Sequence, residues 1–153
     1  DYLLKPVEEE ALRAVLQKLV RAGGEKGRQA ERCLPELVDW LDLLQQDNLN
    51  PYVRDVLGLI AAHYRERLSV EQTADALGIS ASYLSRKLKD QTGHTFNSLV
   101  TRYRLQQSLS LLREGRLRVY EVAEQVGFGD YKNFAQVFRK YLEMTPSQFM
   151  QGL

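Results

Sequence analysis

The sequence predicts an all-α protein in which two helix-turn-helix units are joined by a long helix and preceded by linker helices. The first supporting observation is a repeat, because the stretch 68–93 returns once downstream as 117–143. The second is that apolar residues recur with helical spacing along most of the chain. The third is that glycines and capping residues divide the chain into helices. A repeat of this length indicates one supersecondary unit that is built twice.

The two copies align with a single change of register. The counterparts of Val70, Ala74 and Gly78 lie 49 residues downstream, and beyond one extra residue the offset becomes 50. At the second offset the matched pairs are Leu84 with Phe134, Leu88 with Phe138, Lys89 with Arg139, and Thr95 with Thr145. Both copies therefore share the same order of small, apolar and basic positions.

Each copy has the signals of a helix-turn-helix. In the first copy, Ser69 is the expected N-cap of a helix over 70–77, which ends at Gly78. Ser80 is the expected cap of a second helix, which stops at Gly93. Two short helices joined by a glycine-containing turn form a helix-turn-helix.

The outward face of the second helix in each copy is the candidate functional surface. If the apolar pair of each copy points inward, a turn of 100° per residue defines the outward side. The outward residues are Ser82, Ser85, Arg86 and Lys89 in the first copy, and Lys132, Ala135, Gln136, Arg139 and Lys140 in the second. Hydroxyls and cations suit base edges and phosphates. One such face is equally typical of a solvated helix, whereas two faces on a repeated unit favour DNA binding.

Three motifs in the same region allow a comparison with a known family. They are A-x-x-x-G-I-S-x-S-Y-L-S-R-x-L-K from Ala74, R-x-x-x-S-x-x-L-L from Arg104, and V-A-E-Q-V-G-F…N-F-x-x-x-F-R-K-Y…T-P-S-x-F from Val122. With these motifs, residues 51–153 resemble the DNA-binding domain of the AraC/XylS family of transcription regulators.

The resemblance implies that both recognition helices occupy successive major grooves on one face of double-stranded DNA. Carried over by position, it implies base contacts from Ser82, Ser85, Arg86, Tyr131, Lys132, Asn133 and Gln136. It also implies RNA polymerase as a further candidate partner. One position departs from the family, which usually has glycine where Glu143 stands. Because a left-handed cap costs a non-glycine residue about 1 kcal/mol, we expect this turn to differ and to hold the second recognition helix less securely.

Composition excludes several other classes of protein. No apolar run approaches the roughly 18 residues of a membrane span, and the polar, acidic start DYLLKPVEEE is not a signal peptide, so we expect a cytoplasmic protein. The lone Cys33 excludes an internal disulfide framework, and it is either an incidental thiol or a redox-sensitive one. His63 and His94 are far apart, and no cluster has metal-ligand spacing. We therefore expect no metal, no cofactor and no enzymatic activity.

Charge is distributed unevenly along the chain. Residues 1–50 carry 7 basic and 10 acidic side chains, whereas residues 51–153 carry 14 and 10. The positive part contains both predicted helix-turn-helix units, as binding to a phosphate backbone favours.

The N-terminal segment has a separate resemblance. Residues 1–7 are typical of a short strand, and a helix with one apolar face follows over 8–21. The run D-Y-L-L-K-P-V-E-E-E-A-L resembles the last strand and helix of a CheY-like receiver domain. In that family the lysine, here Lys5, contacts an aspartyl phosphate, and the Lys-Pro bond is cis. The resemblance implies a YesN-like response regulator whose phosphoacceptor aspartate lies upstream of residue 1.

A glycine-rich link and a second helix, expected over 35–46, lead into the output region. Leucines recur in this helix with heptad spacing, at Leu34, Leu37, Leu41 and Leu44. Such a stripe predicts either a homodimer contact or, together with Trp40, packing on the chain's own output domain.

The output region itself is expected to open at Asn50-Pro51, with Asn50 as cap. A helix with a core-facing stripe follows: Val53, Val56, Leu57, Ile60, Ala61 and Tyr64. Thr95 is the expected cap of a long helix to about Arg113, whose apolar residues change face midway and thus serve two small cores. About 19 residues give a length of roughly 28 Å, close to the ~34 Å repeat of DNA. Thr145 and Pro146 start a last short helix that buries Phe149.

The expected organisation is therefore a receiver remnant over 1–28, a linker helix over 29–50, and an AraC-type DNA-binding domain over 51–153. Within that domain the first unit is 51–94, the connecting helix 95–113 and the second unit 114–153. The expected function is sequence-specific binding of double-stranded DNA by a transcription regulator. The competing hypothesis is a helical protein-interaction module whose working surface is residues 1–50.

Overall fold

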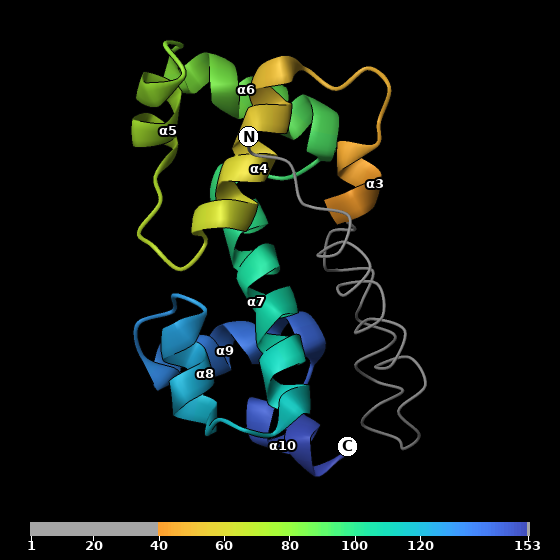
Figure 1. The fold of residues 1–153 in the computed structure, drawn as a ribbon, viewed down its shortest axis with the longest axis vertical. Coiled ribbons are helices and arrows are strands. Elements are labelled where there is room, and N and C mark those ends of the chain that lie inside the picture. Colours follow the sequence, from red (N-terminus) through yellow and green to blue (C-terminus); the bar gives the residue numbers. More distant parts are fainter. Residues whose placement is uncertain (1–39, 153) are drawn as a thin grey trace. The chain divides into compact units, whose positions relative to one another are not determined.

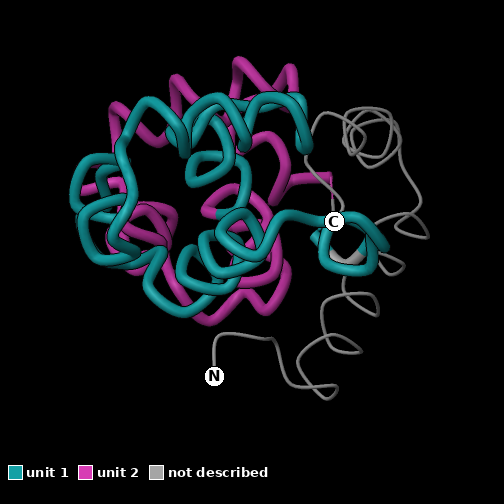
Figure 2. The backbone as a smooth tube through the Cα atoms, turned by 90° about the horizontal axis from the view of Figure 1, so that it is seen from above, with its two compact units in different colours: residues 1–4, 38–103 teal, residues 5–37, 104–153 magenta. Residues whose placement is uncertain are grey.

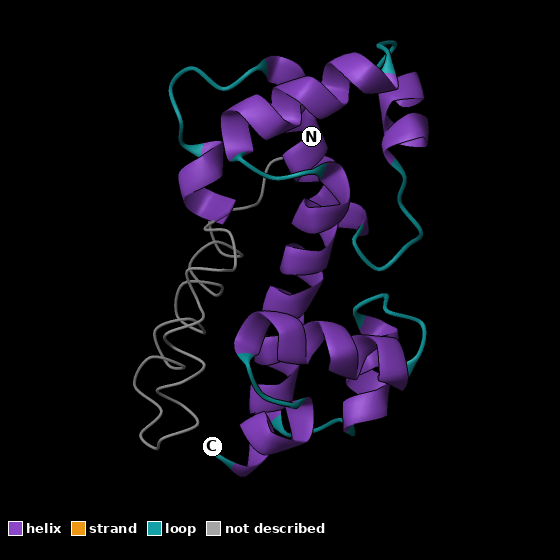
Figure 3. Ribbon diagram, turned by 180° about the vertical axis from the view of Figure 1, so that it is seen from behind, coloured by secondary structure: helices purple, strands orange, loops and turns teal. Residues whose placement is uncertain are grey.

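The computed structural model describes residues 40–152, in which there are eight helices and no strand (Figures 1 and 3). The predicted all-α fold is therefore confirmed for this part of the chain. The predicted receiver remnant lies outside the described residues, as do Cys33, Leu34 and Leu37. The described residues divide into two compact units, coloured separately in Figure 2: unit 1, residues 40–103, and unit 2, residues 104–152.

Helix α7 is shared between the units, and the other helices belong to one of them. Unit 1 contains α3 (Trp40–Leu44), α4 (Pro51–His63), α5 (Val70–Ala76), α6 (Ala81–Thr92) and the first part of α7 (Phe96–Glu114). Unit 2 contains the rest of α7, α8 (Val119–Gln125), α9 (Tyr131–Leu142) and α10 (Pro146–Gln151).

The helices start where the capping residues predict. The Oδ1 of Asn50 accepts a hydrogen bond from the amide of Tyr52 at 2.8 Å, and Pro51 is the first residue of α4. The same kind of bond joins the hydroxyl of Ser69 to the amide of Gln72, that of Ser80 to Tyr83, that of Thr95 to Ser98 and that of Thr145 to Gln148. Each bond satisfies one of the amides that a helix start leaves without a partner in the helix.

The turn inside each helix-turn-helix is the same in both units. The amide of Ile79 donates to the carbonyl of Ala74 at 3.0 Å, and the amide of Phe128, 49 residues later, donates to that of Ala123 at 3.0 Å. Between them, Gly78 and Gly127 have φ angles of 72° and 93°. Only glycine reaches this left-handed region without a steric penalty. The sequence repeat is therefore a repeat of structure.

The turn after the second recognition helix contradicts the expectation drawn from Glu143. Glu143 has φ 60° and ψ 20°, and its amide donates to the carbonyl of Arg139 at 2.9 Å. Gly93, its counterpart after α6, has φ 77°, and its amide donates to Lys89 at the same distance. The prediction of a different turn was wrong. Glu143 keeps the helix-capping hydrogen bond and adopts the left-handed backbone conformation despite its steric cost.

The core of unit 1 includes a residue from the predicted linker helix. Trp40 is only 1% exposed, its indole N–H donates to the carbonyl of Leu57 at 3.2 Å, and its ring lies 4.8 Å from that of Tyr103. Leu44, the last residue of the predicted leucine stripe, is also buried. For these two residues, the structure agrees with packing on the chain's own unit. The core of unit 1 also includes the predicted stripe of α4, except Ala61, which is only half-buried, and Leu84 and Leu88 of α6.

The core of unit 2 is a chain of aromatic rings. Phe134 and Phe138 are fully buried and lie 5.5 Å apart, and they continue to Phe128 at one end and Phe149 at the other, with centroid distances of 5.2 and 6.0 Å. Tilted and edge-on ring pairs of this kind stabilise a core beyond simple burial. They help to hold α9 against the turn after α8 and against α10, and α9 contacts both of these helices.

Helix α7 serves both cores, as its change of apolar face predicts. Phe96, Leu99, Val100 and Tyr103 are buried in its first part, which belongs to unit 1. In its second part, which belongs to unit 2, Leu105, Leu109 and Leu112 are fully buried. The helix ends at Glu114, where Gly115 takes a φ of 72°.

Candidate nucleic-acid interface

Helix α6 is anchored by its apolar side, which leaves the opposite side open to solvent. Leu84 and Leu88 have no exposed surface, Ser80 caps the first turn and Gly93 closes the last one. The four predicted contact residues of this helix are all exposed: Ser82, Ser85, Arg86 and Lys89. The expected separation of an inner and an outer face is therefore confirmed for α6.

Lys89 has a second role that the sequence did not suggest. Its ammonium group donates to the carbonyl of Gly93 at 3.1 Å, at the end of the helix where backbone carbonyls have no partner in the helix. A cation is also favoured at this end by the helix dipole. Arg86, by contrast, lies in the middle of α6, one turn beyond Ser82, with an exposed side chain.

Helix α9 presents the larger candidate surface. Phe134, Phe138 and Leu142 hold its inner side, while the predicted contact residues are all exposed: Tyr131, Lys132, Asn133, Gln136, Arg139 and Lys140. Asp130 caps the helix by accepting from the backbone amide of Asn133 at 2.7 Å, and Asn133 itself is exposed. Tyr131 is 43% exposed at the first position of the helix, so its ring and hydroxyl reach the surface.

The two helices differ in their electrostatics. Helix α9 contains three basic residues and no acidic one, whereas α6 contains three basic residues and Asp90. Lys87, the third cation of α6, is half-buried, with its ammonium group 5.8 Å from the centre of the Tyr83 ring. The α9 surface therefore offers the stronger positive field to a phosphate backbone.

Sequence reasoning missed a third stripe on α6, between the core side and the outward side. It consists of Tyr83, Lys87 and Gln91, spaced four residues apart, and all three are half-buried. Gln91 makes two hydrogen bonds to the backbone of residues 48 and 50. The four-residue spacing is visible in the sequence, but the partners of Gln91 lie 41 and 43 residues away and carry no pattern that points to them.

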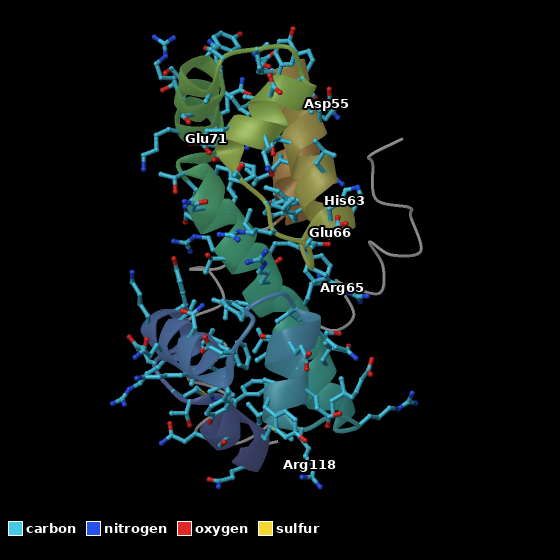
Figure 4. The ribbon with its side chains drawn as sticks, turned by 90° about the vertical axis from the view of Figure 1, so that its left-hand side faces the viewer. Asp55, His63, Arg65, Glu66, Glu71 and Arg118 are labelled. Atoms are coloured by element: carbon cyan, nitrogen blue, oxygen red, sulfur yellow. The ribbon has the colours of Figure 1, made fainter. Side chains whose placement is uncertain are left out.

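Charged residues outside the two recognition helices form local contacts. At the end of α4, His63 Nδ1 lies 2.6 Å from Glu66 Oε2, and the two side chains are seen together in Figure 4. Before α8, the amide of Arg118 donates to the carboxylate of Glu121 at 3.0 Å. Among residues 40–152 there is no group of three side chains suited to holding a metal ion. None of the helices in this part of the chain is both long and apolar enough to cross a membrane.

Comparison with known proteins identifies the family of the chain. A family model described as a helix-turn-helix domain matches residues 73–152. The transcriptional regulatory protein HptR of Staphylococcus aureus is 37% identical over 150 residues, which cover 97% of this chain and 59% of that protein. The chain thus spans less than two thirds of the length of the curated relatives it matches.

Two solved structures are similar to this chain, each with 31% sequence identity. The C-terminal domain of AraT, a response regulator from Geobacillus stearothermophilus, has a TM-score of 0.67 and covers 70% of this chain and 89% of that one. The C-terminal domain of the two-component response regulator yesN from Fusobacterium nucleatum has a TM-score of 0.59 and covers 62% of this chain and 93% of that one. Because the family match extends over more than half of the chain, the protein belongs to the AraC-type helix-turn-helix family of DNA-binding transcription regulators.

Proposed function

We propose that the chain binds double-stranded DNA at specific sequences through α6 and α9, as the output part of a two-component response regulator. The observation that supports this most strongly is the pair of equivalent helices. Both have a buried apolar side, the same closing turn and an exposed side with cations and hydrogen-bonding groups. Side chains of these types pair with base edges in the major groove and with phosphates.

Within this proposal the exposed residues have two kinds of role. Residues near the start and middle of each helix would read bases: Ser82, Ser85 and Arg86 on α6, and Tyr131, Lys132, Asn133 and Gln136 on α9. The cations nearer the helix ends would contact phosphates: Lys89, Arg139 and Lys140. Lys89 and Arg139 are counterparts in the repeat, which supports giving them the same role.

The response-regulator context is supported by two independent observations. Residues 1–12 resemble the end of a receiver domain, and the solved relatives AraT and yesN are both response regulators. A receiver would end at about residue 28, a linker would follow to residue 50, and the DNA-binding domain would occupy 51–153. A regulator of this kind would work in the cytoplasm, where bacterial DNA lies.

Selection from a random pool of duplexes tests the proposed function. The full chain is expected to enrich one sequence, and that sequence is expected to bind about a thousandfold or more tightly than unrelated duplex. Enrichment of no sequence would contradict the proposal. Weak DNA binding together with capture of a protein partner by residues 1–50 would favour the interaction-module hypothesis instead.

We also propose a homodimer through the leucine spacing at Leu34, Leu37 and Leu41. Leu44 is left out of this contact because its side chain is buried within unit 1. Glutamate at Leu37 and Leu41 should convert the dimer to a monomer, since two buried charges without partners are strongly unfavourable at such an interface. Sedimentation measures both states, and a wild-type chain that is monomeric at high micromolar concentration would exclude the dimer.

A contact with RNA polymerase is a further part of the proposal, supported by family membership alone. Added polymerase should increase the occupancy of the selected duplex, as measured by footprinting. Unchanged occupancy would count against the contact.

A further inference from the structure

Gln91 joins the recognition helix α6 to the segment through which the chain enters unit 1. Its Oε1 accepts from the amide of Asn50 at 2.8 Å, and its Nε2 donates to the carbonyl of Asn48 at 3.0 Å. Residues 45–50 connect α3 to α4. Both the oxygen and the nitrogen of this side-chain amide therefore form hydrogen bonds with one short stretch of backbone. The two bonded residues lie 41 and 43 positions before Gln91 in the sequence.

A second attachment lies two turns earlier on α6. The Asn50 side-chain amide lies 3.4 Å from the hydroxyl of Tyr83 and donates to it, while the other end of this amide caps α4. The Tyr83 ring meets the edge of the Tyr52 ring at 6.2 Å and carries the ammonium group of Lys87 over its face. The connecting segment thus holds one side of α6 at two points, Tyr83 and Gln91.

The other end of the connecting segment is fixed as well. The last turn of α3 is capped by Arg54, whose Nη1 donates to the carbonyl of Leu44 at 3.2 Å. Trp40, at the start of α3, is bonded to Leu57 of α4 and buried. A displacement of α3 would therefore pull on residues 45–50, and these residues are bonded directly to α6.

We propose that Gln91 is a positioning residue that couples the docking of α3 to the placement of α6 on DNA, an inference that rests on the proposed DNA-binding function. Arg86 stands on the same helix as Gln91, so any shift of α6 moves the side chains that meet the bases. Recognition groups must be held to within about 0.5 Å and 10–20° to be effective. The alternative is that Gln91 only satisfies backbone groups of a connecting segment.

The experiment measures the discrimination of each half-site, which is the ratio of the affinity for the selected duplex to the affinity for a duplex with that half-site scrambled. Such a ratio does not depend on the folded fraction of a variant. The full chain is titrated against its selected duplex and against duplexes in which either half-site is scrambled. The first half-site is defined as the one whose discrimination is lost in Arg86→Ala. Gln91→Met, which keeps the length of the side chain and removes both hydrogen bonds, should reduce discrimination of the first half-site about fivefold. Discrimination of the second half-site should stay as in the wild type.

The matched control is Gln72→Met, an exposed glutamine of α5 in the same unit. It should leave both ratios unchanged. Gln91→Ala serves as the second variant if Gln91→Met does not fold. An unchanged first-half ratio in the folded Gln91 variant, or an equal loss at both half-sites, would overturn the proposal. Failure of the wild-type chain to select any duplex would instead overturn the proposed function itself.

A double-mutant cycle tests the link to α3. Trp40→Phe removes the indole donor and keeps an aromatic ring, so it should loosen α3 and lower discrimination of the first half-site about twofold to threefold in the wild-type background. In the Gln91→Met background it should produce a much smaller further loss, because the only attachment of the connecting segment to α6 described above that remains is the 3.4 Å contact of Asn50 with Tyr83. If the two losses multiply, α3 acts on α6 by another route and the coupling role of Gln91 is wrong.

Discussion

Arg86 and Lys89 are both exposed cations of α6, and their different surroundings predict different contacts with DNA. Arg86 lies almost opposite the buried Leu84 and reaches outward from mid-helix, where a guanidinium can pair both acceptors of a guanine. Arg86→Ala should therefore weaken binding to the selected duplex and relax preference at one base pair by about 1–3 kcal/mol. Titration against all single-base changes in the first half-site measures this. A uniform loss across those sequences would make Arg86 a phosphate contact.

Lys89 already contacts the residue that closes its own helix, so in the proposed complex it would lie nearer the groove wall than the bases. Lys89→Ala should weaken selected and unrelated duplexes alike and reduce the log–log salt slope by about one unit. The check is a salt series on both duplexes. A change in base preference in this variant would contradict the assignment.

Glu143 is the only non-glycine residue among 40–152 with a positive φ, and it follows the last turn of α9. Glutamate is unfavourable here for two reasons, since it occupies the left-handed region and places a carboxylate at the negative end of a helix dipole. Glu143→Gly should raise the free energy of unfolding by about 1 kcal/mol. Chemical denaturation measures the change, with Gly93→Ala as the opposing control. A loss of stability in Glu143→Gly would mean that contacts of the glutamate outweigh its strain.

At the scale of elements, α7 is the helix on which both cores depend. Leu99 and Leu109 are fully buried on its two parts, so alanine at either site should cost about 2–5 kcal/mol. Leu99→Ala should lower amide hydrogen-exchange protection mainly in residues 40–103, and Leu109→Ala mainly in 104–152. Exchange measured by mass spectrometry distinguishes the two patterns. Equal loss of protection in both units from either variant would show that the cores are not separate.

The elements that were predictable are those whose signals are local. Ser69, Ser80 and Thr95 cap the helices expected of them because a cap needs only the sequence of the following turn. The repeat then identified the second unit from the first. The exposed faces of α6 and α9 followed from helical periodicity, once the buried pairs such as Leu84 and Leu88 were recognised.

The features that were missed depend on distant or competing interactions. The packing of Trp40 on its own unit was one of two stated alternatives, but its hydrogen bond to the carbonyl of Leu57 was not predicted, because a backbone group has no sequence signature. Gln91 likewise contacts backbone atoms of the segment before α4. The expectation for Glu143 failed because local preference was weighed without the hydrogen bond to Arg139, which keeps the turn in place. Local propensity is routinely overridden by such contacts.

At the scale of the whole chain, the two units differ in charge. Residues 40–103 carry 7 basic and 7 acidic side chains, whereas residues 104–152 carry 7 and 5. Unit 2 should therefore contribute more of the salt-dependent, non-specific attraction to DNA. Linking two helix-turn-helix units in one chain raises the effective concentration of the second unit once the first is bound to DNA. Their combined affinity therefore exceeds that of either unit alone.

The central claim is that the exposed faces of α6 and α9 bind DNA, and the salt dependence of affinity tests it most directly. The cations on these faces are Arg86, Lys89, Lys132, Arg139 and Lys140. Three of them, Lys89, Arg139 and Lys140, are the proposed phosphate contacts, so the slope of log affinity against log salt on the selected duplex should approach about −2.7, from roughly −0.9 for each contact. Alanine at Arg139 and Lys140 together should reduce the slope by about 1.8 by the same relation. A flat response of the wild-type chain between low and physiological salt would contradict the claim.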